Sequence, residues 1–454
     1  MTCAAFAAGA PAALPNSVVE VMTAQKLPSN SLSFVIVDPD TGRIVMSHNP
    51  DTPRSPASTI KTITTYAALD ILGPTYVWQT KASTLDGDLY LQGGGDPYIT
   101  LERWWSFVQS VRSQGLKTIR GDIVIDNTAF SLPTEDPGAF DGRPNRSYNV
   151  LPDALMVNFQ SIDFRLAADA DSHEVDVVAN PSPANLEIEN HIRYTPGRCS
   201  GSAGRVDFKI ASPQWDRVVF SGSLSPHCAE RTFARVLLKP STYAFGTFVE
   251  LWRNSGGEFT GKMRTGTTPP DAKLLFSYES LSLAEIVRLT NKHSSNLMAR
   301  HLLLTIGKER YGEPATLEKG TAAIAEWAHD RGFDLSNVDI DNGSGLSRST
   351  HISVLQMAKI LSAAYHSRFA PEFIASLPLA GLDGTLRSRM KSTPAGFVRL
   401  KTGHLDGVSG VAGYVTTPAG RPFVLVSLVN NSRADFGAAE PVHAALVAWI
   451  LANL

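Results

Sequence analysis

Residues Pro56-Ala57-Ser58-Thr59-Ile60-Lys61 decide how the rest of the chain is interpreted. Apolar residues continue from Ile60 to Leu69 at roughly helical spacing, which predicts a largely buried helix with Ser58 at its N-terminal end. Ser58 and Lys61 are three residues apart, so they lie on one face of that helix. A hydroxyl beside an amine suits a nucleophile and its base. The backbone N–H of a serine at a helix start can also stabilise an oxyanion.

A Ser-x-x-Lys motif alone is weak evidence, because Ser388-Arg389-Met390-Lys391 also matches it. In this chain two further motifs follow in order, Ser294-Ser295-Asn296 and Lys401-Thr402-Gly403. Serine acyl-transfer enzymes that react with penicillin use this order. The ordered triple predicts five catalytic residues: Ser58, Lys61, Ser294, Asn296 and Lys401.

The composition indicates a globular chain with ordinary cores. At 454 residues, 43% hydrophobic and 19% charged, the sequence is long enough for two or three domains. Its 41 Lys and Arg against 43 Asp and Glu give a net charge of −2, which favours neither nucleic acid nor an anionic membrane surface as a partner. No stretch approaches ~18 uninterrupted apolar residues, so no transmembrane helix is expected.

The N-terminal segment and the cysteines bear on the cellular compartment. Residues 1–15 are rich in alanine and end in small-residue triplets that resemble the cleavage end of a secretory signal, but no basic region precedes them. They are either the remnant of a leader or a flexible terminus. Outside this segment only Cys199 and Cys228 remain, and an even pair in an exported protein favours a disulfide over two unpaired thiols.

The order of predicted elements indicates one domain that is interrupted by another. Strands over 33–37 and 44–46 precede the Ser58 helix. Strands over 397–400, closed by Lys401, over 410–415 and over 422–429 come near the end, before a helix over 440–451. A helix over 281–304 carries Ser294 and Asn296. These segments predict one sheet assembled from both ends of the sequence, with the middle as an insertion.

The middle of the chain contains two parts that differ in their predicted secondary structure. Strands over 87–92 and 121–126 flank a helix over 101–113, and a further helix covers 243–253, which predicts an α/β unit. Between residues 162 and 237, short alternating segments such as 174–178, 184–188 and 217–220 are separated by polar turns. They predict a small all-β module that contains both cysteines.

Six stretches together resemble the low-molecular-mass class C penicillin-binding proteins, the D-alanyl-D-alanine carboxypeptidase and endopeptidase family. They are Pro56–Lys61, Leu91–Pro97, Asn291–Asn296, Asp341–Arg348, Leu379–Leu386 and Lys401–Gly403. The resemblance implies an α+β fold, in which a β-lactamase/transpeptidase-like α/β catalytic domain is interrupted by an α/β domain that carries a small all-β domain. The corresponding boundaries are 16–80 with 280–454, 81–161 with 238–279, and 162–237, after the leader or flexible terminus at 1–15.

The resemblance implies a penicillin-sensitive serine DD-peptidase, exported to the periplasm or cell envelope, that hydrolyses D-Ala-D-Ala ends and cross-links of peptidoglycan stem peptides. Ser58 forms the acyl-enzyme, neutral Lys61 takes its proton, Ser294 relays a proton, and β-lactams acylate the same serine. Asn296 is expected to hydrogen-bond the substrate amide and Lys401 to act electrostatically. Substrate binding falls to Thr402, Gly403 and His404, and the N–H groups of Ser58 and His404 form the oxyanion hole.

Two positions depart from the family pattern. His404 stands where Thr or Ser is usual, and we expect its side chain to face the substrate's terminal carboxylate. Ser295 stands where Asp is common, and Asp141, the nearest acid to the expected side-chain subsite, matches too poorly to be assigned. No cofactor is implied. Neither His293 nor His404 has a His, Asp or Glu partner at i, i+4 spacing, so no metal is expected.

Two alternative functions remain. A serine β-lactamase shares the first chemical steps but commonly deacylates through an extra glutamate, which Trp327-Ala328-His329-Asp330-Arg331 does not supply at about the expected distance. A non-catalytic cell-envelope binding protein would be favoured by the loss of Ser58, Lys61 or Lys401, and all three are present.

Overall fold

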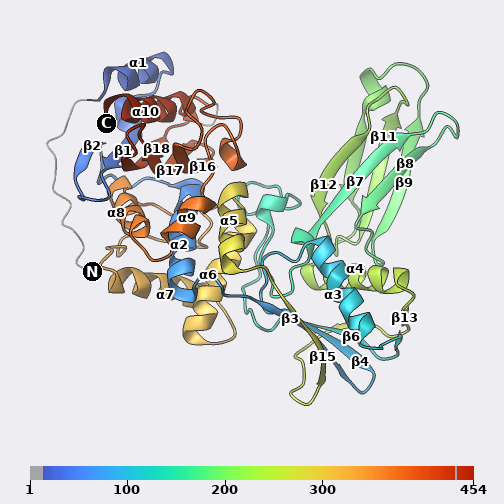
Figure 1. Ribbon diagram of the computed structural model, residues 1–454. Helices are drawn as coiled ribbons and strands as arrows, with labels where there is room; N and C mark the ends of the chain where they lie inside the picture. Colours follow the sequence, from blue (N-terminus) through green and yellow to red (C-terminus); the bar gives the residue numbers. More distant parts are fainter. Residues whose placement is uncertain (1–13, 435–436) are drawn as a thin grey trace. The chain divides into compact units, whose positions relative to one another are not determined.

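The computed structural model describes residues 14–434 and 437–454. The chain divides into two compact units (Figure 1). The terminal unit comprises Met1–Tyr76 and Leu281–Leu454, and the inserted unit comprises Val77–Ser280. Of the predicted leader or flexible terminus, only residues 14 and 15 are described.

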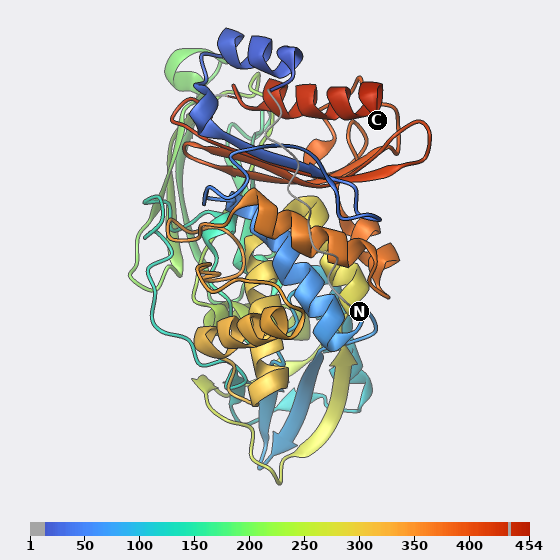
Figure 2. The same ribbon diagram turned by 90° about the vertical axis from the view of Figure 1, so that its left-hand side faces the viewer.

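The terminal unit is built on an antiparallel five-stranded sheet in the order β16-β17-β18-β1-β2. The strands are β1 (Leu32–Val37), β2 (Ile44–His48), β16 (Val398–Leu405), β17 (Val408–Thr416) and β18 (Pro422–Asn430). Figure 2 shows α1 (Asn16–Ala24) and α10 (Glu440–Asn453) on one face, and α2 (Lys61–Leu72) and α8 (Val354–Tyr365) on the other. Because both faces are covered, every residue of β1 is buried and its sequence is a nearly continuous apolar run.

Further helices complete this unit, namely α5 (Leu283–His293), α6 (Asn296–Tyr311), α7 (Leu317–Asp330) and α9 (Ala370–Ser376). The predicted α+β fold class is confirmed, and so are the strands near both ends of the chain and the C-terminal helix. The prediction of one helix over 281–304 is wrong. Ser294 has left-handed backbone angles, φ 56° and ψ 38°, which end α5 before α6 begins.

The sequence predicted that Lys401 closes its strand, and this prediction is wrong. Strand β16 continues to Leu405, which pairs with Val408 of β17. The strand can pass close to the Ser58 turn because Gly403 has no side chain. A Cβ atom at that position would lie 2.5 Å from the carbonyl oxygen of Pro56. Lys401 therefore lies in the interior of β16.

The inserted unit contains a mixed five-stranded sheet in the order β14-β6-β4-β3-β15. Its strands are β3 (Gln79–Leu85), β4 (Asp88–Gln92), β6 (Ile123–Asp126), β14 (Met263–Thr265) and β15 (Lys273–Glu279). The predicted helices are present as α3 (Leu101–Ser113) and α4 (Pro240–Asn254), and a small parallel pair joins β5 (Thr118–Ile119) to β13 (Glu258–Phe259).

Two three-stranded sheets follow within residues 161–236, in the orders β12-β7-β8 and β10-β11-β9. Their strands are β7 (Ser161–Ala168), β8 (Val175–Asn180), β9 (Glu187–Tyr194), β10 (Val206–Ile210), β11 (Arg217–Leu224) and β12 (Arg231–Val236). Phe164, Phe208, Phe220 and Phe233 form one aromatic cluster drawn from both sheets. The predicted strand over 184–188 is misplaced, because a turn closed by Leu186 N–H and the Pro183 carbonyl delays β9 until Glu187.

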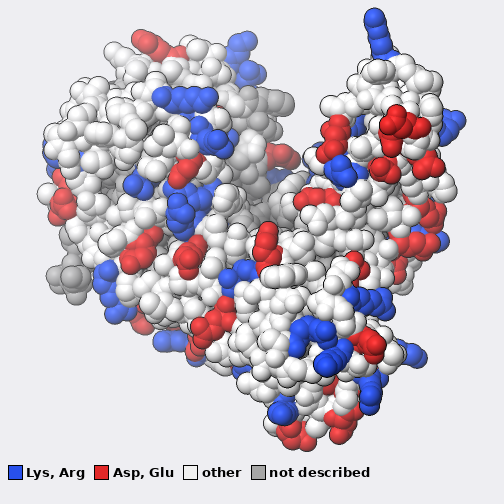
Figure 3. All heavy atoms as spheres, turned by 45° about the vertical axis from the view of Figure 1, so that its right-hand side comes forward, with Lys and Arg blue, Asp and Glu red and all other residues white. Residues whose placement is uncertain are grey.

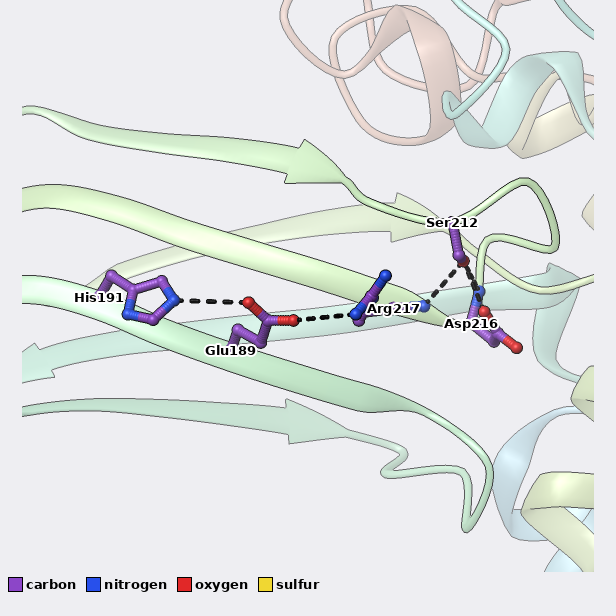
Figure 4. A network of polar contacts seen from close by, with 5 residues as sticks. All are labelled: Glu189, His191, Ser212, Asp216 and Arg217. Carbon is purple, nitrogen blue, oxygen red and sulfur yellow. Dashed lines mark hydrogen bonds and ion pairs between the residues drawn. The ribbon is translucent and has the colours of Figure 1, made fainter.

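Polar contacts also connect β9 with β11, as Figure 4 shows. Glu189 lies 3.5 Å from Arg217 and 3.4 Å from His191. The Ser212 hydroxyl donates to Asp216 at 2.5 Å and accepts from the backbone N–H of Arg217 at 3.2 Å. Cys199 and Cys228, in the same module, are joined by a disulfide with an S–S distance of 2.08 Å.

Candidate active site

The turn that carries Ser58 is a 3-10 helix, η2 (Ala57–Ile60), which leads into α2. Ser58 is partly exposed while its neighbours Ala57 and Thr59 are buried. Two glycines, which have no side chain, allow neighbouring segments to pack closely against this turn. A Cβ atom on Gly345 would lie 2.0 Å from the Ala57 carbonyl oxygen, and one on Gly403 would lie 3.1 Å from the backbone nitrogen of Thr59. The turn is therefore fixed between the loop at Gly345 and strand β16.

Lys61 lies at the start of α2 and is fully buried, with 0% exposure. Its Nζ lies 2.9 Å from Ser58 Oγ and 2.7 Å from Asn296 Oδ1, and it also donates to the Ser344 carbonyl. The two carbonyl oxygens can only accept hydrogen bonds, whereas a hydroxyl can donate. A neutral amine can therefore donate to Asn296 and Ser344 and direct its lone pair at the Ser58 hydroxyl.

The electrostatic surroundings favour that neutral amine. Burial lowers the pKa of Lys61 well below its ordinary value, and the positive charges of Lys401 and Arg300 lower the pKa further. Arg300 lies on α6 one turn after Asn296 and is 9% exposed. Arg300 was not predicted from the sequence. Its i, i+4 spacing from Asn296 in a mostly apolar helix is the pattern that could have identified it.

Lys401 and Ser294 form a second contact between motifs. Lys401 Nζ donates to Ser294 Oγ at 2.7 Å and to the Thr402 carbonyl at 2.7 Å. Burial lowers the pKa of Lys401 to about 7. The left-handed residue Ser294 lies between α5 and α6, and Ser295 caps α6 by accepting from the N–H of Met298 at 3.3 Å. The five predicted catalytic residues thus form two hydrogen-bonded groups, Lys61 with Ser58 and Asn296, and Lys401 with Ser294. The two groups are coupled electrostatically, because the charge of Lys401 lowers the pKa of Lys61.

The predicted substrate-binding residues follow along β16. Thr402 Oγ1 donates to Thr385 Oγ1 at 2.7 Å. The turn that carries Thr385 is held by Asp383, which pairs with Lys292 at 2.6 Å and accepts from the N–H of Leu379 at 2.7 Å. His404 is exposed. Because side chains alternate along a strand, His404 shares the face of Thr402 and not that of Gly403. Thr385 is another residue that the sequence analysis did not assign.

A second polar cluster, on and beside strands β9 and β11, lacks the arrangement of a catalytic centre. The cluster in Figure 4 contains serine, histidine and carboxylates, but Glu189 lies between His191 and Arg217, so no histidine is placed between a serine and an acid as a nucleophilic triad requires. Within residues 14–434 and 437–454, no group of three or more His, Cys, Asp and Glu side chains is placed to hold a metal ion. No helix in those ranges is long and apolar enough to span a membrane.

The sheet with helices on both faces, the serine–lysine pair and the second lysine define the class of serine acyl-transfer enzymes that react with penicillin. The sequence profile of the D-Ala-D-Ala carboxypeptidase 3 (S13) family matches residues 14–453. The chain belongs to this family and is a serine-type D-Ala-D-Ala carboxypeptidase, as the sequence analysis predicted.

Individual relatives agree with this assignment. A D-alanyl-D-alanine carboxypeptidase of Actinomadura sp. is 30% identical over 427 residues, which are 88% of this chain and 77% of the relative. The crystal structure of penicillin-binding protein 4 from Haemophilus influenzae has a TM-score of 0.79 at 24% identity, and the match covers 96% of this chain and 100% of that one. A penicillin G-acylated endopeptidase from Bdellovibrio bacteriovorus matches at a TM-score of 0.53 and 17% identity, with 92% of each chain covered.

Proposed function

We propose that the protein is an exported, penicillin-sensitive DD-peptidase that removes terminal D-alanine from peptidoglycan stem peptides through an acyl-enzyme on Ser58. The observation that carries this proposal is the environment of Lys61 Nζ, where two obligate acceptors leave the lone pair of a neutral amine to the Ser58 hydroxyl. The Haemophilus relative was solved in complex with a β-lactam, and the Bdellovibrio endopeptidase was acylated by penicillin G, which supports the same chemistry here.

In the proposed mechanism, Ser58 Oγ attacks the carbonyl carbon between the two D-alanines while Lys61 takes the hydroxyl proton. The backbone N–H groups of Ser58 and His404 stabilise the oxyanion. Ser294, hydrogen-bonded to Lys401, relays to the leaving nitrogen the proton that Lys61 took, and D-alanine departs. Water then attacks the ester carbonyl and gives a proton to Lys61, the ester C–O bond breaks, and Lys61 returns that proton to Ser58.

Substrate orientation falls to residues beside this centre. Asn296 holds Lys61 and contacts the substrate amide, while Thr402 and Gly403 bind along β16. The same centre can release an amine that belongs to a neighbouring stem peptide, which would be endopeptidase action on a cross-link. The endopeptidase relatives from Bdellovibrio support this second substrate. The small-residue triplets of residues 1–15 support export.

Mass spectrometry of the intact protein after penicillin treatment tests the proposal. We expect one stable adduct that peptide mapping assigns to Ser58, no adduct on Ser58→Ala, and release of D-alanine from a D-Ala-D-Ala peptide by the unmodified enzyme. A label on another residue would refute the assignment of the nucleophile. Rapid turnover of a chromogenic β-lactam would favour a β-lactamase instead, and binding of peptidoglycan without any acylation would favour a non-catalytic protein.

The role of His404 can be tested separately. A protonated imidazole adds a charge-assisted hydrogen bond to a carboxylate, which a threonine hydroxyl cannot. In a Ser58→Ala background, additional His404→Thr substitution should therefore weaken the binding of a carboxylate-terminated peptide. If the affinity is unchanged, position 404 contributes only its backbone N–H.

A further inference from the structure

A second cavity lies entirely within the inserted unit, apart from the groups assigned to catalysis. It has a volume of about 730 Å³ and is lined by the loop 142–146 and by strands β10 and β12. These are outer strands of their three-stranded sheets, since β12 pairs only with β7 and β10 only with β11. The loop is attached to β12 by the N–H of Val236, which donates to the Asn145 carbonyl at 3.1 Å.

The lining of this cavity is unusually basic. Four arginines contribute to it, Arg143, Arg146, Arg231 and Arg235. Among the described residues none of the four guanidinium groups lies within 4.0 Å of a carboxylate oxygen, although the charge of Arg143 lowers the pKa of nearby Asp141. The one acidic lining residue, Asp207, lies 3.7 Å from Arg205, outside the lining. Elsewhere, on the face drawn in Figure 3, basic and acidic side chains are interspersed. Four arginines around one cavity therefore depart from the surface's general pattern.

Contacts within the protein hold one of these guanidinium groups and place a second beside the disulfide. Arg235 stacks over Phe233, with its guanidinium carbon 4.6 Å from the ring centroid, and over Phe208 at 5.4 Å. Arg231 Nη2 lies 3.1 Å from the position that a Cβ atom on Gly204 would occupy, and the Cys199 sulfur lies equally near that point. The disulfide and the Arg231 guanidinium therefore lie near each other at the start of β12.

Like charges held this close repel one another. Burial lowers the pKa of Arg235, and the neighbouring charge of Arg146 lowers it further. An anion would relieve the repulsion, and a planar guanidinium pairs with a carboxylate through two parallel hydrogen bonds. Leu166, Val206, Phe208 and Phe233 add an apolar floor, which suits an organic chain that carries carboxylates better than it suits a bare phosphate.

We propose that this arginine pocket binds the carboxylate groups of peptidoglycan stem peptides and so anchors the enzyme to its polymeric substrate. The inference rests on the proposed function, because it names a second contact with the substrate of the catalytic serine. A polymer held at one point is present at a higher effective concentration for the other. The pocket should therefore matter for intact peptidoglycan and not for a short soluble peptide.

The test measures co-sedimentation of the full chain with purified peptidoglycan sacculi, in a Ser58→Ala background that cannot digest them. Replacing both Arg146 and Arg231 with glutamine should lower the apparent affinity roughly tenfold or more, since two charge-assisted contacts are lost. The matched control replaces Arg165 and Arg217 with glutamine, because these exposed arginines of the same module lie outside the pocket and pair with Glu230 and Glu189. The control should bind as the parent protein does.

Further arms separate the possible causes of failure. With Ser58 intact, the Arg146/Arg231 variant should release D-alanine from a soluble peptide at the parental rate. An intact Cys199–Cys228 disulfide and an unchanged Tm show that the variant is folded, and Arg146→Lys with Arg231→Lys should retain part of the binding. Unchanged binding of sacculi by the glutamine variant overturns the inference. So does loss of binding to phosphatidylglycerol vesicles with sacculus binding unaffected, since that outcome assigns the pocket to phosphate. Absence of penicillin acylation on unmodified protein would instead refute the proposed function.

Discussion

Three features lower the pKa of Lys61 and so favour its neutral form: complete burial, and the neighbouring charges of Lys401 and Arg300. A base in an acyl-transfer reaction is useful only in its deprotonated form, and lysine is ordinarily protonated at neutral pH. The arrangement therefore lets the Lys61 amine act as a base at a pH where a solvent-exposed lysine would be protonated. It also makes the activity depend on the charge of Arg300, a residue that the proposed mechanism does not place in contact with the substrate.

Arg300 provides the sharpest test of this dependence. Arg300→Gln removes one positive charge beside Lys61, so the pKa of Lys61 should rise and the acidic limb of the pH–acylation profile should move to higher pH by roughly one unit. The measurement is the second-order rate of penicillin acylation as a function of pH. Arg300→Lys retains the charge and is the matched control. If the limb stays in place in Arg300→Gln, the coupling between the two residues is negligible.

Lys401 should also influence stability as the pH changes. Its pKa is lowered to about 7 in the folded protein from an unfolded value near 10.5, so between these values the unfolded chain binds more protons. Stability should therefore rise with pH across this window, by up to roughly 1.4 kcal/mol per pH unit. Urea unfolding at pH 7 and at pH 9 measures the slope. Lys401→Met should show a smaller slope, and an equal slope would contradict the assignment.

The sequence allowed the five motif residues to be predicted because their side chains occur at recognisable spacings. It did not reveal Arg300, since one arginine in a helix is usually a solvated side chain, and only the packing of α6 against α2 shows that this one is buried. The acceptor at Ser344 is a backbone carbonyl, which any residue type could supply. Such a contact leaves no trace in the pattern of side chains.

The break between α5 and α6 shows why the prediction of one helix was wrong: the spacing of apolar residues does not reveal where a helix is interrupted. Burial continues on both sides of Ser294, but the left-handed backbone of this one residue ends α5 and places its hydroxyl at Lys401. A single β-carbon in that conformation costs about 1–2 kcal/mol. The strained conformation occurs at Ser294, the residue that the proposed mechanism uses as a proton relay.

Substitutions at Ser294 should separate this backbone cost from the chemistry. Ser294→Ala and Ser294→Gly both remove the hydroxyl, so both should slow acylation strongly. Glycine adopts φ 56° without a steric penalty, so Ser294→Gly should be more stable than Ser294→Ala by about 1 kcal/mol. Urea denaturation compares the two variants. Equal stabilities would show that the left-handed conformation is not strained.

The close packing of the Ser58 turn leads to a second paired comparison. Gly345 and Gly73 both have positive φ, 75° and 82°, but a Cβ atom on Gly345 would lie 2.0 Å from the Ala57 carbonyl oxygen, whereas one on Gly73 would meet nothing within 4 Å. Gly73→Ala should cost only the backbone term and leave acylation nearly unchanged. Gly345→Ala should also displace the turn and slow acylation by roughly 10²-fold. Similar acylation rates in the two variants would contradict the role given to this contact.

Loss of the disulfide should lower the stability of one compact unit and leave the activity of the other unchanged. Cys199 and Cys228 are separated by 29 positions, and in the loop-entropy model closing a loop of this size stabilises the fold by about 3 kcal/mol. The double variant Cys199→Ser/Cys228→Ser should therefore lose stability in the inserted unit and retain penicillin acylation by the terminal unit. Calorimetry with acylation measured on the same samples checks this. A parallel loss of acylation would show that the two units do not unfold independently.

The insertion could be predicted from the sequence because the strands of one sheet occur at both ends of the chain with a change of character between them. Strands β3 and β15, which pair with each other, were not predicted. Residues Gln79–Leu85 of β3 are mostly polar and lack a clear alternation of apolar residues. The further division of the inserted part at residues 162–237 stays a prediction. It would be tested by whether that segment unfolds in a separate calorimetric transition.

The pairing of β1 with β18 sets the order of events while the chain is being made. Strand β1 ends at Val37, but its partner β18 begins only at Pro422. The inserted unit is contiguous, so it can fold while the ribosome is still translating the second half of the terminal unit. Until then, the edge of β1 that β18 will cover presents unpaired backbone groups, and its apolar side chains can aggregate. We therefore expect nascent chains that lack β18 to depend on a holding chaperone, and the terminal unit to become protease-resistant only after β18 has been made.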